Sequence, residues 1–429
     1  MKALLKRALI ALLTLEARIV LKKYKPKVIA VTGSVGKTTT KDAIYSVLNE
    51  HVFIRKSEKS FNSEVGIPLT VLGAKNAWNN PLRWLGVLLD GLALILASSR
   101  YPHWLLLEVG ADTPGDIQSV SKWLKPHIVV VTRIPDVPVH VEAFPSPEAV
   151  VEEKAALVDA LRVDGLLVLN GDDPRVAELA RRTGAQVALF GTTPKTAFYG
   201  AGYSVLYDSG VPTGACFRIE HSGSSVPVRI TGSIGEQLLM PVLATAAVCS
   251  YVGVDLSSVS VVSGTFAPPA GRMRILRGLK GTTIIDDSYN ASPVAVHEAL
   301  RAIKSLEVEG RKVAVLGDML ELGSYSSEEH KKVGKAVAEV ADVLLTVGLR
   351  ARGIAEGALE AGMSEKNILQ YEEPRRAGKE LELLLEAGDV VLVKGSQSMR
   401  MERVVKEVMA EPERASELLV RQESEWLER

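Results

Sequence analysis

An apolar run, a glycine-punctuated turn and a helical segment follow one another between Val28 and Leu48 of this 429-residue chain. Gly33 and Gly36 let the backbone turn tightly, so successive N–H groups between them can face one anion. The helix expected to begin at Lys37 points its N-terminal dipole and free N–H groups at the same place. This succession predicts a strand of an α/β sheet that ends in a phosphate cradle.

The cradle carries side chains suited to a nucleoside triphosphate. Lys37 supplies a point charge for the outer phosphates, and the hydroxyl of Thr38 or Thr39 can ligate Mg²⁺. The longer form of this loop needs glycine at position 31, where the chain has Val31, so the loop is the shorter G-x-x-G-K-T-T form. An ordinary strand-to-helix turn that contains a lysine is the alternative. ATP binding is the prediction, by Gly33, Ser34, Val35, Gly36, Lys37, Thr38 and Thr39.

The composition is that of a soluble globular protein of two or three domains. Hydrophobic residues make up 47% and charged residues 24% of the chain. Because 51 Lys and Arg balance 51 Asp and Glu, no nucleic acid is expected as a partner. Cys216 and Cys249 lack metal-ligand spacing, so both are predicted to be reduced thiols of a cytoplasmic protein.

Two strongly apolar stretches, residues 3–21 and 82–98, are long enough to raise the question of a signal peptide or a membrane-spanning helix. Charged residues interrupt both: Lys6, Arg7, Glu16 and Arg18 in the first, Arg83 and Asp90 in the second. A signal peptide or a spanning helix is therefore not expected. Residues 3–21 are predicted to form an amphipathic helix that packs on the body, with peripheral contact to a membrane surface as the alternative. Residues 82–98 are predicted to be a core helix or a hydrophobic helix on the substrate side.

Apolar strands alternate with helical patterns twice along the chain, which is typical of parallel sheets covered by helices. Between the two patterns, short alternating runs from Phe198 to Ile230 predict an antiparallel hairpin insertion, and a helix is expected from Gln237 to Val252. The predicted strands are Val28–Val31, Trp104–Leu107, Ile128–Val131 and Leu166–Leu169, then Thr283–Ile285, Val313–Leu316, Val343–Val347 and Val390–Val393; helices are expected at 37–49, 115–124 and 147–162.

The predicted fold class is therefore α/β: a P-loop-type central ATPase domain with a mostly parallel sheet, and a smaller Rossmann-like C-terminal α/β domain. The best domain boundary is the run Ala267–Gly271, which contains two prolines. The predicted divisions are an N-terminal helix at 1–24, the ATP-binding domain at 25–270 and the C-terminal domain at 271–429. A cleft between the two α/β domains is the expected place for an active site.

Polar residues follow several of the predicted strands, where ligands of open α/β sheets gather. Glu108 comes directly after one strand and is predicted to ligate the magnesium of ATP beside the phosphate loop. Three strands of the second domain end in polar turns, at Asp286–Pro293, Gly317–Gly323 and Lys394–Ser396, which predicts a ligand-facing rim. By sequence alone, His140 and Lys154 are an ordinary loop histidine and an exposed helix lysine.

Together these segments resemble the Mur ligase family, the ATP-dependent amide-forming enzymes of peptidoglycan precursor synthesis. The resemblance covers about residues 25–410, and the runs Gly317–Gly323 and Lys394–Ser396 are the most specific to the branch that adds D-alanyl-D-alanine. The similar stretches are Thr32–Thr39, Asn62–Thr70, Glu108–Ile117, Asn170–Pro174, Asp286–Pro293, Gly317–Gly323, Val393–Ser396 and Met399–Glu402.

The resemblance implies two Mg²⁺ ions, one held by Thr38 and Glu108 and one by His140 and a carbamylated Lys154. It also implies that the catalytic residues are Lys37, Lys154 and His140. The nucleotide contacts that it adds to the phosphate loop are Asn62, Arg272 for the phosphates, and Asp286 and Asn290 near the ribose and adenine.

The implied reaction phosphorylates a carboxylate from ATP, and an amine then attacks the acyl phosphate. The implied substrates are D-alanyl-D-alanine and a carboxylate-bearing muramoyl-peptide precursor, and a monomer is expected. The branch usually has a further N-terminal domain for the UDP-sugar, but only about 25 residues precede the first strand here, too few for a core of their own. The acceptor is thus either held differently or is another precursor, for example a lipid-linked one.

Two other functions stay open at this stage. One is another Mur-superfamily amide ligase, of the folylpolyglutamate or cyanophycin type, which would share the phosphate loop but not the two branch-specific runs. The other is a nucleotide-binding scaffold without catalysis, which would have no need for Glu108, His140 and Lys154 together.

Overall fold

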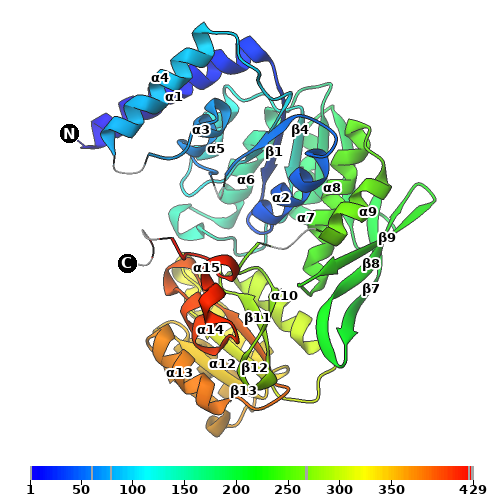
Figure 1. The fold of residues 1–429 in the computed structure, drawn as a ribbon, viewed down its shortest axis with the longest axis vertical. Helices are drawn as coiled ribbons and strands as arrows, with labels where there is room; N and C mark the ends of the chain where they lie inside the picture. Colours follow the sequence, from blue (N-terminus) through cyan, green and yellow to red (C-terminus); the bar gives the residue numbers. More distant parts are fainter. Residues whose placement is uncertain (1, 59–60, 78–79, 266–268, 424–425, 427–429) are drawn as a thin grey trace.

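The chain forms two β-sheets, one in the upper and one in the lower part of the view in Figure 1. The structure, a computed structural model, describes residues 2–58, 61–77, 80–265, 269–423 and 426. The first sheet has nine strands in the order β2-β3-β1-β4-β5-β6-β7-β8-β9, and the second has six in the order β10-β11-β15-β12-β13-β14. The predicted boundary at residue 270 adjoins residues 266–268, which lie outside the described residues, and it stays a prediction.

The first six strands of the large sheet run parallel, as predicted. They are β1 (Lys27–Thr32), β2 (Ile54–Lys56), β3 (Trp104–Glu108), β4 (Ile128–Val131), β5 (Leu166–Asn170) and β6 (Gln186–Gly191). Every residue of β3, β4 and β5 is buried, which explains why these strands are continuous apolar runs in the sequence. Strands β2 and β6 were not predicted, because each is short or only half buried.

Helices cover both faces of this sheet, and successive residues of β1 alternate between them. Val28 and Ala30 pack with one helical layer, and Ile29 and Val31 pack with the other. The first layer contains α3 (Gly66–Leu72), α5 (Asp116–Ser121), α6 (Pro147–Asp159) and α7 (Pro174–Glu178); the second contains α2 (Lys37–Leu48), α8 (Leu239–Val252) and α9 (Leu256–Thr265). The predicted helices at 37–49, 115–124, 147–162 and 237–252 are confirmed with slightly different ends.

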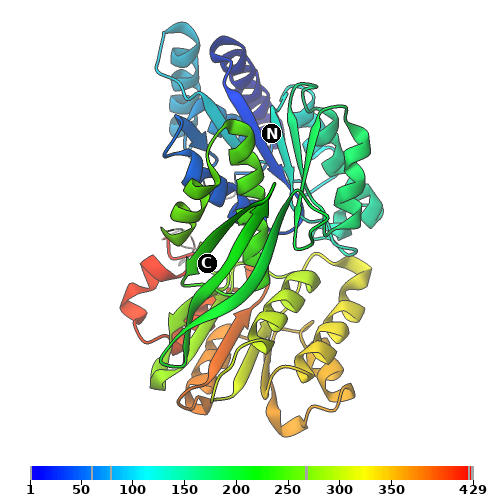
Figure 2. The ribbon, with the colours of Figure 1, turned by 90° about the vertical axis from the view of Figure 1, so that its right-hand side faces the viewer.

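An antiparallel meander extends the large sheet toward the second domain (Figure 2). Its strands are β7 (Phe198–Asp208), β8 (Val211–His221) and β9 (Ser224–Thr231). The predicted hairpin is confirmed, but it is no separate insertion, because β7 pairs in parallel with β6. Hydrogen bonds join this side of the sheet to the second domain: the Tyr207 hydroxyl accepts one from the Glu307 N–H (2.9 Å), and the Ile275 N–H donates to the Gly232 carbonyl (2.9 Å).

The second sheet is the predicted Rossmann-like one. Its parallel strands are β11 (Thr283–Asp287), β12 (Lys312–Gly317), β13 (Val343–Val347), β14 (Ile368–Tyr371) and β15 (Val390–Lys394), and β10 (Arg274–Arg277) adds an antiparallel edge. The core on one face is built with α10 (Pro293–Lys304), α11 (Ser326–Ala338) and α12 (Arg352–Glu360), and on the other with α13 (Pro374–Leu384), α14 (Glu402–Val408) and α15 (Ala415–Leu418).

Helices α1 (Lys2–Tyr24) and α4 (Pro81–Leu96) form a pair outside the layers of the large sheet (Figure 1). The predicted packing of α1 on the body is confirmed, because Leu13, Ala17 and Val20 are fully buried. The core-helix alternative for 82–98 is wrong: only Val87 and Gly91 of α4 are buried, because a single narrow stripe of α4 meets its neighbours. The other alternative, a hydrophobic helix on the substrate side, stays a prediction. Within the described residues, no helix combines the length and apolarity needed to cross a bilayer.

Candidate active site

The phosphate loop and the polar rim of the second domain line one cleft of about 1500 Å³. Ligand pockets are commonly about 300–1,000 Å³, so this cleft has room for more than one substrate. Three of the predicted site residues, Gly33, Lys154 and Asp286, are not among its lining residues. The predicted residues that do line it are Ser34, Val35, Gly36, Lys37, Thr38, Thr39, Asn62, Glu108, His140, Arg272 and Asn290.

The phosphate loop depends on glycine at two places. Gly33 has φ +138°, and a Cβ there would lie 2.0 Å from Oγ1 of Thr132. Gly36 has φ +86° and directly precedes the first residue of α2. The Lys37 ammonium donates to the Gly33 carbonyl (2.9 Å), so it lies folded over the loop at the place where phosphate oxygens would compete for it.

Thr38 and Glu108 meet beside this loop. The Thr38 hydroxyl donates to Oε1 of Glu108 (3.1 Å), and Oε2 of Glu108 is buried without a hydrogen-bond partner. Mg²⁺ typically takes one or two protein carboxylates and completes its octahedron with phosphate oxygens and water. A hydroxyl and a carboxylate oxygen without a hydrogen-bond partner, next to a phosphate cradle, fit that ion.

Lys41 is a site residue that the sequence reasoning missed. Its side chain is fully buried on α2, and its ammonium lies 3.7 Å from Oε2 of Glu108 and 3.7 Å from Oδ1 of Asp42. It also donates to the Ser57 carbonyl (3.1 Å). Burial lowers the pKa of Lys41, while the carboxylates of Asp42 and Glu108 raise it. No sequence signal marks it, since a lysine one turn into a helix is usually solvated.

His140 joins the two domains. It follows β4 in a left-handed conformation (φ +66°) that turns its ring into the cleft. Its Nδ1 lies 2.8 Å from Oε2 of Glu321, and its Nε2 lies 3.6 Å from Oδ1 of Asp112. The bond to His140 lowers the pKa of Glu321. Asp112 and Glu321 both lie in the motifs quoted above, but no role was predicted for either.

Lys154 lies on α6, and its side chain is buried and does not line the cleft. Burial lowers the pKa of Lys154 to about 7, and the positive charge of Lys37 contributes to this shift. The carboxylates of Glu153 and Asp112 have the opposite, smaller effect. Its expected role as an exposed lysine is therefore wrong. The neighbouring Glu153 accepts hydrogen bonds from the N–H groups of Gly115, Ile117 and Gln118, which fixes α6 against the N-terminus of α5.

Within the described residues, His140 forms ion pairs with Asp112 and Glu321. The charge of Asp112 acts on Lys154 and also on Lys37. Asp112 therefore interacts with His140 by contact and with Lys154 through its charge. No group of three His, Cys, Asp or Glu in the described part of the chain could hold a metal ion alone.

A second contact closes the cleft on the other side of the loop. Arg133, which follows β4, forms an ion pair with Glu298 of α10. Burial raises the pKa of Glu298, and Arg133 lowers it. With the His140–Glu321 contact, this pair holds the two domains together across the cleft.

The rim of the second domain is built around Lys394 at the end of β15. Its ammonium donates to Oδ2 of Asp287 (2.6 Å) and to the carbonyl of Asn290 (2.8 Å). The side chain of Asn290 in turn accepts from the N–H of Gln397 (3.3 Å). The Leu320 N–H of the third turn donates to Oγ of Ser396 (2.8 Å), so the three polar turns predicted to form a rim meet at one edge, although Asp287 and not Asp286 lines the cleft.

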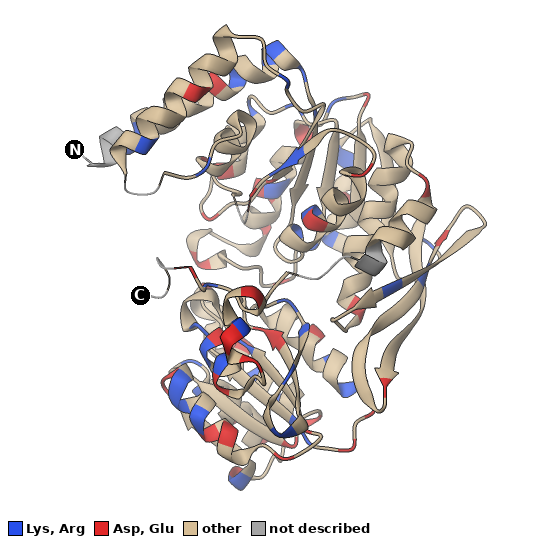
Figure 3. Ribbon diagram, viewed as in Figure 1, with Lys and Arg blue, Asp and Glu red and all other residues tan. Residues whose placement is uncertain are grey.

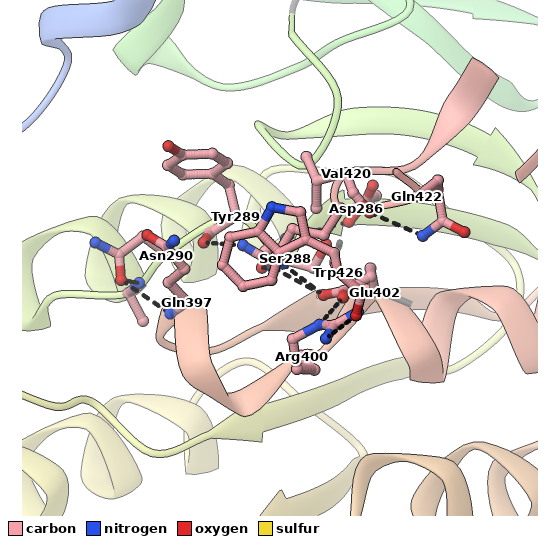
Figure 4. A network of polar contacts seen from close by, with 12 residues as sticks. Asp286, Ser288, Tyr289, Asn290, Gln397, Arg400, Glu402, Val420, Gln422 and Trp426 are labelled. Carbon is pink, nitrogen blue, oxygen red and sulfur yellow. Dashed lines mark hydrogen bonds and ion pairs between the residues drawn. The ribbon is translucent and has the colours of Figure 1, made fainter. Parts of the chain in front are cut away.

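Asp286 lies below the rim, fully buried, in a network that includes the C-terminal segment (Figure 4). Its Oδ1 accepts from the Ser288 N–H (3.1 Å), and its Oδ2 is buried without a partner. Burial raises the pKa of Asp286 to about 6. Arg421 ties the C-terminal segment to this place through Glu402 (2.7 Å) and the Ser288 carbonyl (2.7 Å). The predicted contact of Asp286 with the ribose or adenine stays a prediction. The burial of Asp286 argues for a structural role.

Arg272, the predicted phosphate arginine, stacks over the ring of Tyr289 at 4.3 Å. Its charge acts on Lys37, which places the guanidinium near the phosphate loop although it belongs to the second domain's side of the cleft. A phosphate loop on one α/β domain, facing cations of a second across a closable cleft, defines a two-domain nucleotide-dependent enzyme.

Family comparisons agree with this class. The model "Mur ligase middle domain" matches residues 31–82 and 89–249, and the model "Mur ligase, glutamate ligase domain" matches residues 271–397. The chain therefore belongs to the Mur ligase family, as its motifs predicted, and it is a ligase that forms carbon–nitrogen bonds.

Individual members of the family and solved structures are similar to this chain over most of its length. The chain is 29% identical to the UDP-N-acetylmuramoyl-tripeptide–D-alanyl-D-alanine ligase of Bacillus subtilis, over 92% of this chain and 79% of the relative. It is 31% identical to the enzyme of the same name from Mycobacterium tuberculosis, over 90% and 73%. Its structure is similar to that of the MurF ligase of Thermotoga maritima in complex with ADP, with a TM-score of 0.75 and 27% identity over 93% and 83% of the two chains.

Proposed function

We propose that this chain joins D-alanyl-D-alanine to the free carboxylate of a muramoyl-tripeptide precursor of peptidoglycan, with ATP as the phosphoryl donor and Mg²⁺ as the metal. The observation that supports this most directly is the phosphate cradle with Lys37, Thr38 and the carboxylate of Glu108 on its rim, where one carboxylate oxygen has no hydrogen-bond partner. The choice of substrates rests on the names of the relatives, which align over about nine-tenths of the chain.

An amide does not form from a carboxylate and an amine in water without activation, so the carboxylate first receives the γ-phosphoryl group of ATP. The amine of the dipeptide then attacks the acyl carbon, the new C–N bond forms, and inorganic phosphate leaves. In this reaction Lys37 exchanges the Gly33 carbonyl for the phosphates, and the N–H groups of the loop hold them in line. Arg272 adds charge from the opposite wall of the cleft.

The ligands proposed for one Mg²⁺ are Thr38 and Glu108, and for a second His140 and a carbamylated Lys154. When bound, these ions neutralise the phosphates so that the anionic carboxylate can approach. The burial of Lys154 supports the carbamate, because its low pKa leaves much of the amine neutral near pH 7. The neutral nitrogen attacks CO₂, a proton leaves to solvent, and the resulting anion would face the nearby cation of Lys37.

The contacts His140–Glu321 and Arg133–Glu298 serve the same chemistry. Both join the domains, and a closed cleft excludes water that would hydrolyse an acyl phosphate. We also propose that the enzyme is cytoplasmic and monomeric, which fractionation and light scattering test directly.

The experiment measures ADP release with ATP, Mg²⁺, D-alanyl-D-alanine and UDP-N-acetylmuramoyl-tripeptide, leaving out one component at a time. Release that needs both substrates supports the proposal. Release with L-glutamate and a folate acceptor would instead identify a folylpolyglutamate-type ligase, and no release with any acceptor despite ATP binding would identify a scaffold.

Lys154→Ala tests the carbamate, with the exposed Lys122→Ala as its matched control. Isotope-labelled bicarbonate should give a carbamate signal in the wild type and in Lys122→Ala, and none in Lys154→Ala. Loss of activity without loss of a carbamate signal would contradict the assignment of Lys154 as a ligand.

A further inference from the structure

The helix pair α1/α4 presents two rows of large apolar side chains to solvent. Each row follows helical spacing and lies on the side of its helix turned away from the buried stripe. Leu82 and Leu96, at the two ends of α4, are 80% and 77% exposed. The rows consist of Leu12, Leu15 and Ile19 on α1, and Leu82, Leu85, Leu89, Leu92 and Leu96 on α4. Large apolar side chains that gather on an exposed surface are a feature of interaction sites on soluble proteins.

The two helices are joined to each other, and Leu13, Ala17 and Val20 of α1 are buried against the body, so the rows are a fixed surface. The Lys23 ammonium donates to the carbonyls of Leu94 (2.9 Å) and Ile95 (3.0 Å), at the C-terminal end of α4. The Tyr24 hydroxyl donates to the Leu94 carbonyl (3.0 Å), and its ring stacks on Tyr101 at 4.5 Å. These contacts lock the two helices side by side, as Figures 1 and 2 both show.

Charge on this pair is strongly one-sided, although the whole chain is neutral. Helix α1 carries six cations against the single acid Glu16, which is partly buried toward Gly91 of α4. Arg18 and Lys22 are exposed and border the row at Leu15 and Ile19 by helical geometry. Figure 3 shows cations toward both ends of the pair. The six are Lys2, Lys6, Arg7, Arg18, Lys22 and Lys23.

We propose that the α1/α4 pair binds the surface of an anionic lipid bilayer, with the leucine rows at the level of the acyl chains and the cations at the headgroups. Basic residues beside an apolar helix face are the features that hold a helix in the plane of a membrane. A second copy of the chain fits less well, because two faces with the same excess of positive charge repel. The absence of a spanning helix in the described residues agrees with binding at the surface.

The position of the pair links the bilayer to the active site. Helices α1 and α4 both pack on α3, which begins at Gly66, close after the cleft-lining Asn62. A membrane under the pair would therefore hold the first domain by its substrate-cleft wall. This proposal does not depend on which amide the enzyme forms.

The test is sedimentation of the full chain with vesicles of phosphatidylcholine alone or mixed with phosphatidylglycerol. Binding to the anionic vesicles that weakens with salt is expected, with little binding to the neutral ones. The double variant Arg18→Gln with Lys22→Gln should bind the anionic vesicles about 25-fold more weakly, because each cation contributes about fivefold to the affinity. Leu85→Glu with Leu89→Glu should weaken it at least tenfold.

Leu383→Glu is the matched control, since that leucine of α13 is 76% exposed and lies on the second domain. It should bind vesicles like the wild type, and all variants should keep their circular dichroism and their ADP release with soluble substrates. No binding to anionic vesicles, or equal loss in Leu383→Glu, would overturn the proposal. Self-association of the wild type that Leu85→Glu with Leu89→Glu abolishes, without vesicle binding, would assign the face to a second copy instead.

Discussion

Asp286→Asn should stabilise the protein at neutral pH, because the carboxylate is buried with one oxygen lacking a partner. The change keeps the shape of the side chain and lets its oxygen still accept from the Ser288 N–H. It removes the charge, whose burial raises the pKa of Asp286 from its usual 3.8 to about 6. If Asp286→Asn stabilises the protein, Asp286 is a structural residue whose buried charge lowers stability, and not a nucleotide ligand.

The magnitude follows from linkage. Between pH 3.8 and about 6 the folded chain holds this proton more tightly than the unfolded chain, so the free energy of unfolding of the wild type falls as pH rises. A shift of this size corresponds to about 3 kcal/mol once both states are ionised. Asp286→Asn should therefore exceed the wild type by about 1.5 kcal/mol at pH 5 and about 3 kcal/mol at pH 8.

Hydrogen exchange of the β11 and β15 amides, at several urea concentrations, measures this stability within the second domain. Asp287→Asn is the matched control with the opposite sign, because it leaves the buried Lys394 ammonium without its carboxylate and should cost about 3 kcal/mol or more. A less stable Asp286→Asn at pH 8 would refute the reasoning, since it would mean that a cation in the network compensates the charge. A loss of ATP affinity instead would return Asp286 to the nucleotide site.

Three further predictions concern the cleft. Glu108→Gln should raise the Mg²⁺ concentration for half-maximal ADP release at least tenfold, and an unchanged Mg²⁺ dependence would remove Glu108 from the metal site. Gly33→Ala should abolish the thermal shift caused by ATP, because its methyl group would collide with Thr132; a normal shift would show that the loop rearranges. Glu298→Gln should lower kcat more than ATP affinity, since it weakens the Arg133 pair that helps hold the cleft closed, and a change in ATP affinity alone would contradict that role.

Much of the fold could be predicted from the sequence because its strands are fully buried. Residues 128–131, all apolar, are the strand β4 at the predicted bounds. Short or half-exposed strands such as β2 and β14 carry no comparable pattern. The core alternative for α4 failed for a different reason: apolar composition alone does not distinguish a helix packed in a core from one that exposes most of its leucines.

The candidate site was predictable where chemistry is local in sequence. The glycines and Lys37 of the phosphate loop lie within five residues of one another, and Glu108 ends a strand that pairs with β1. Lys41 and Asp112 were missed because their significance comes from burial and from neighbours distant in the chain. The partner of His140 was also beyond sequence reasoning, since Glu321 lies in the other domain.

The meander that prolongs the large sheet also sets how the enzyme can open. The backbone of Gly232 and the hydroxyl of Tyr207 bind the second domain on that side, whereas ion pairs of side chains join the domains at the cleft. Side-chain ion pairs separate and re-form more readily than a backbone connection, so the meander should act as the hinge. Substrates would then enter and leave at the margin farthest from it, and the amplitude of the swing would depend on the stiffness of three paired strands.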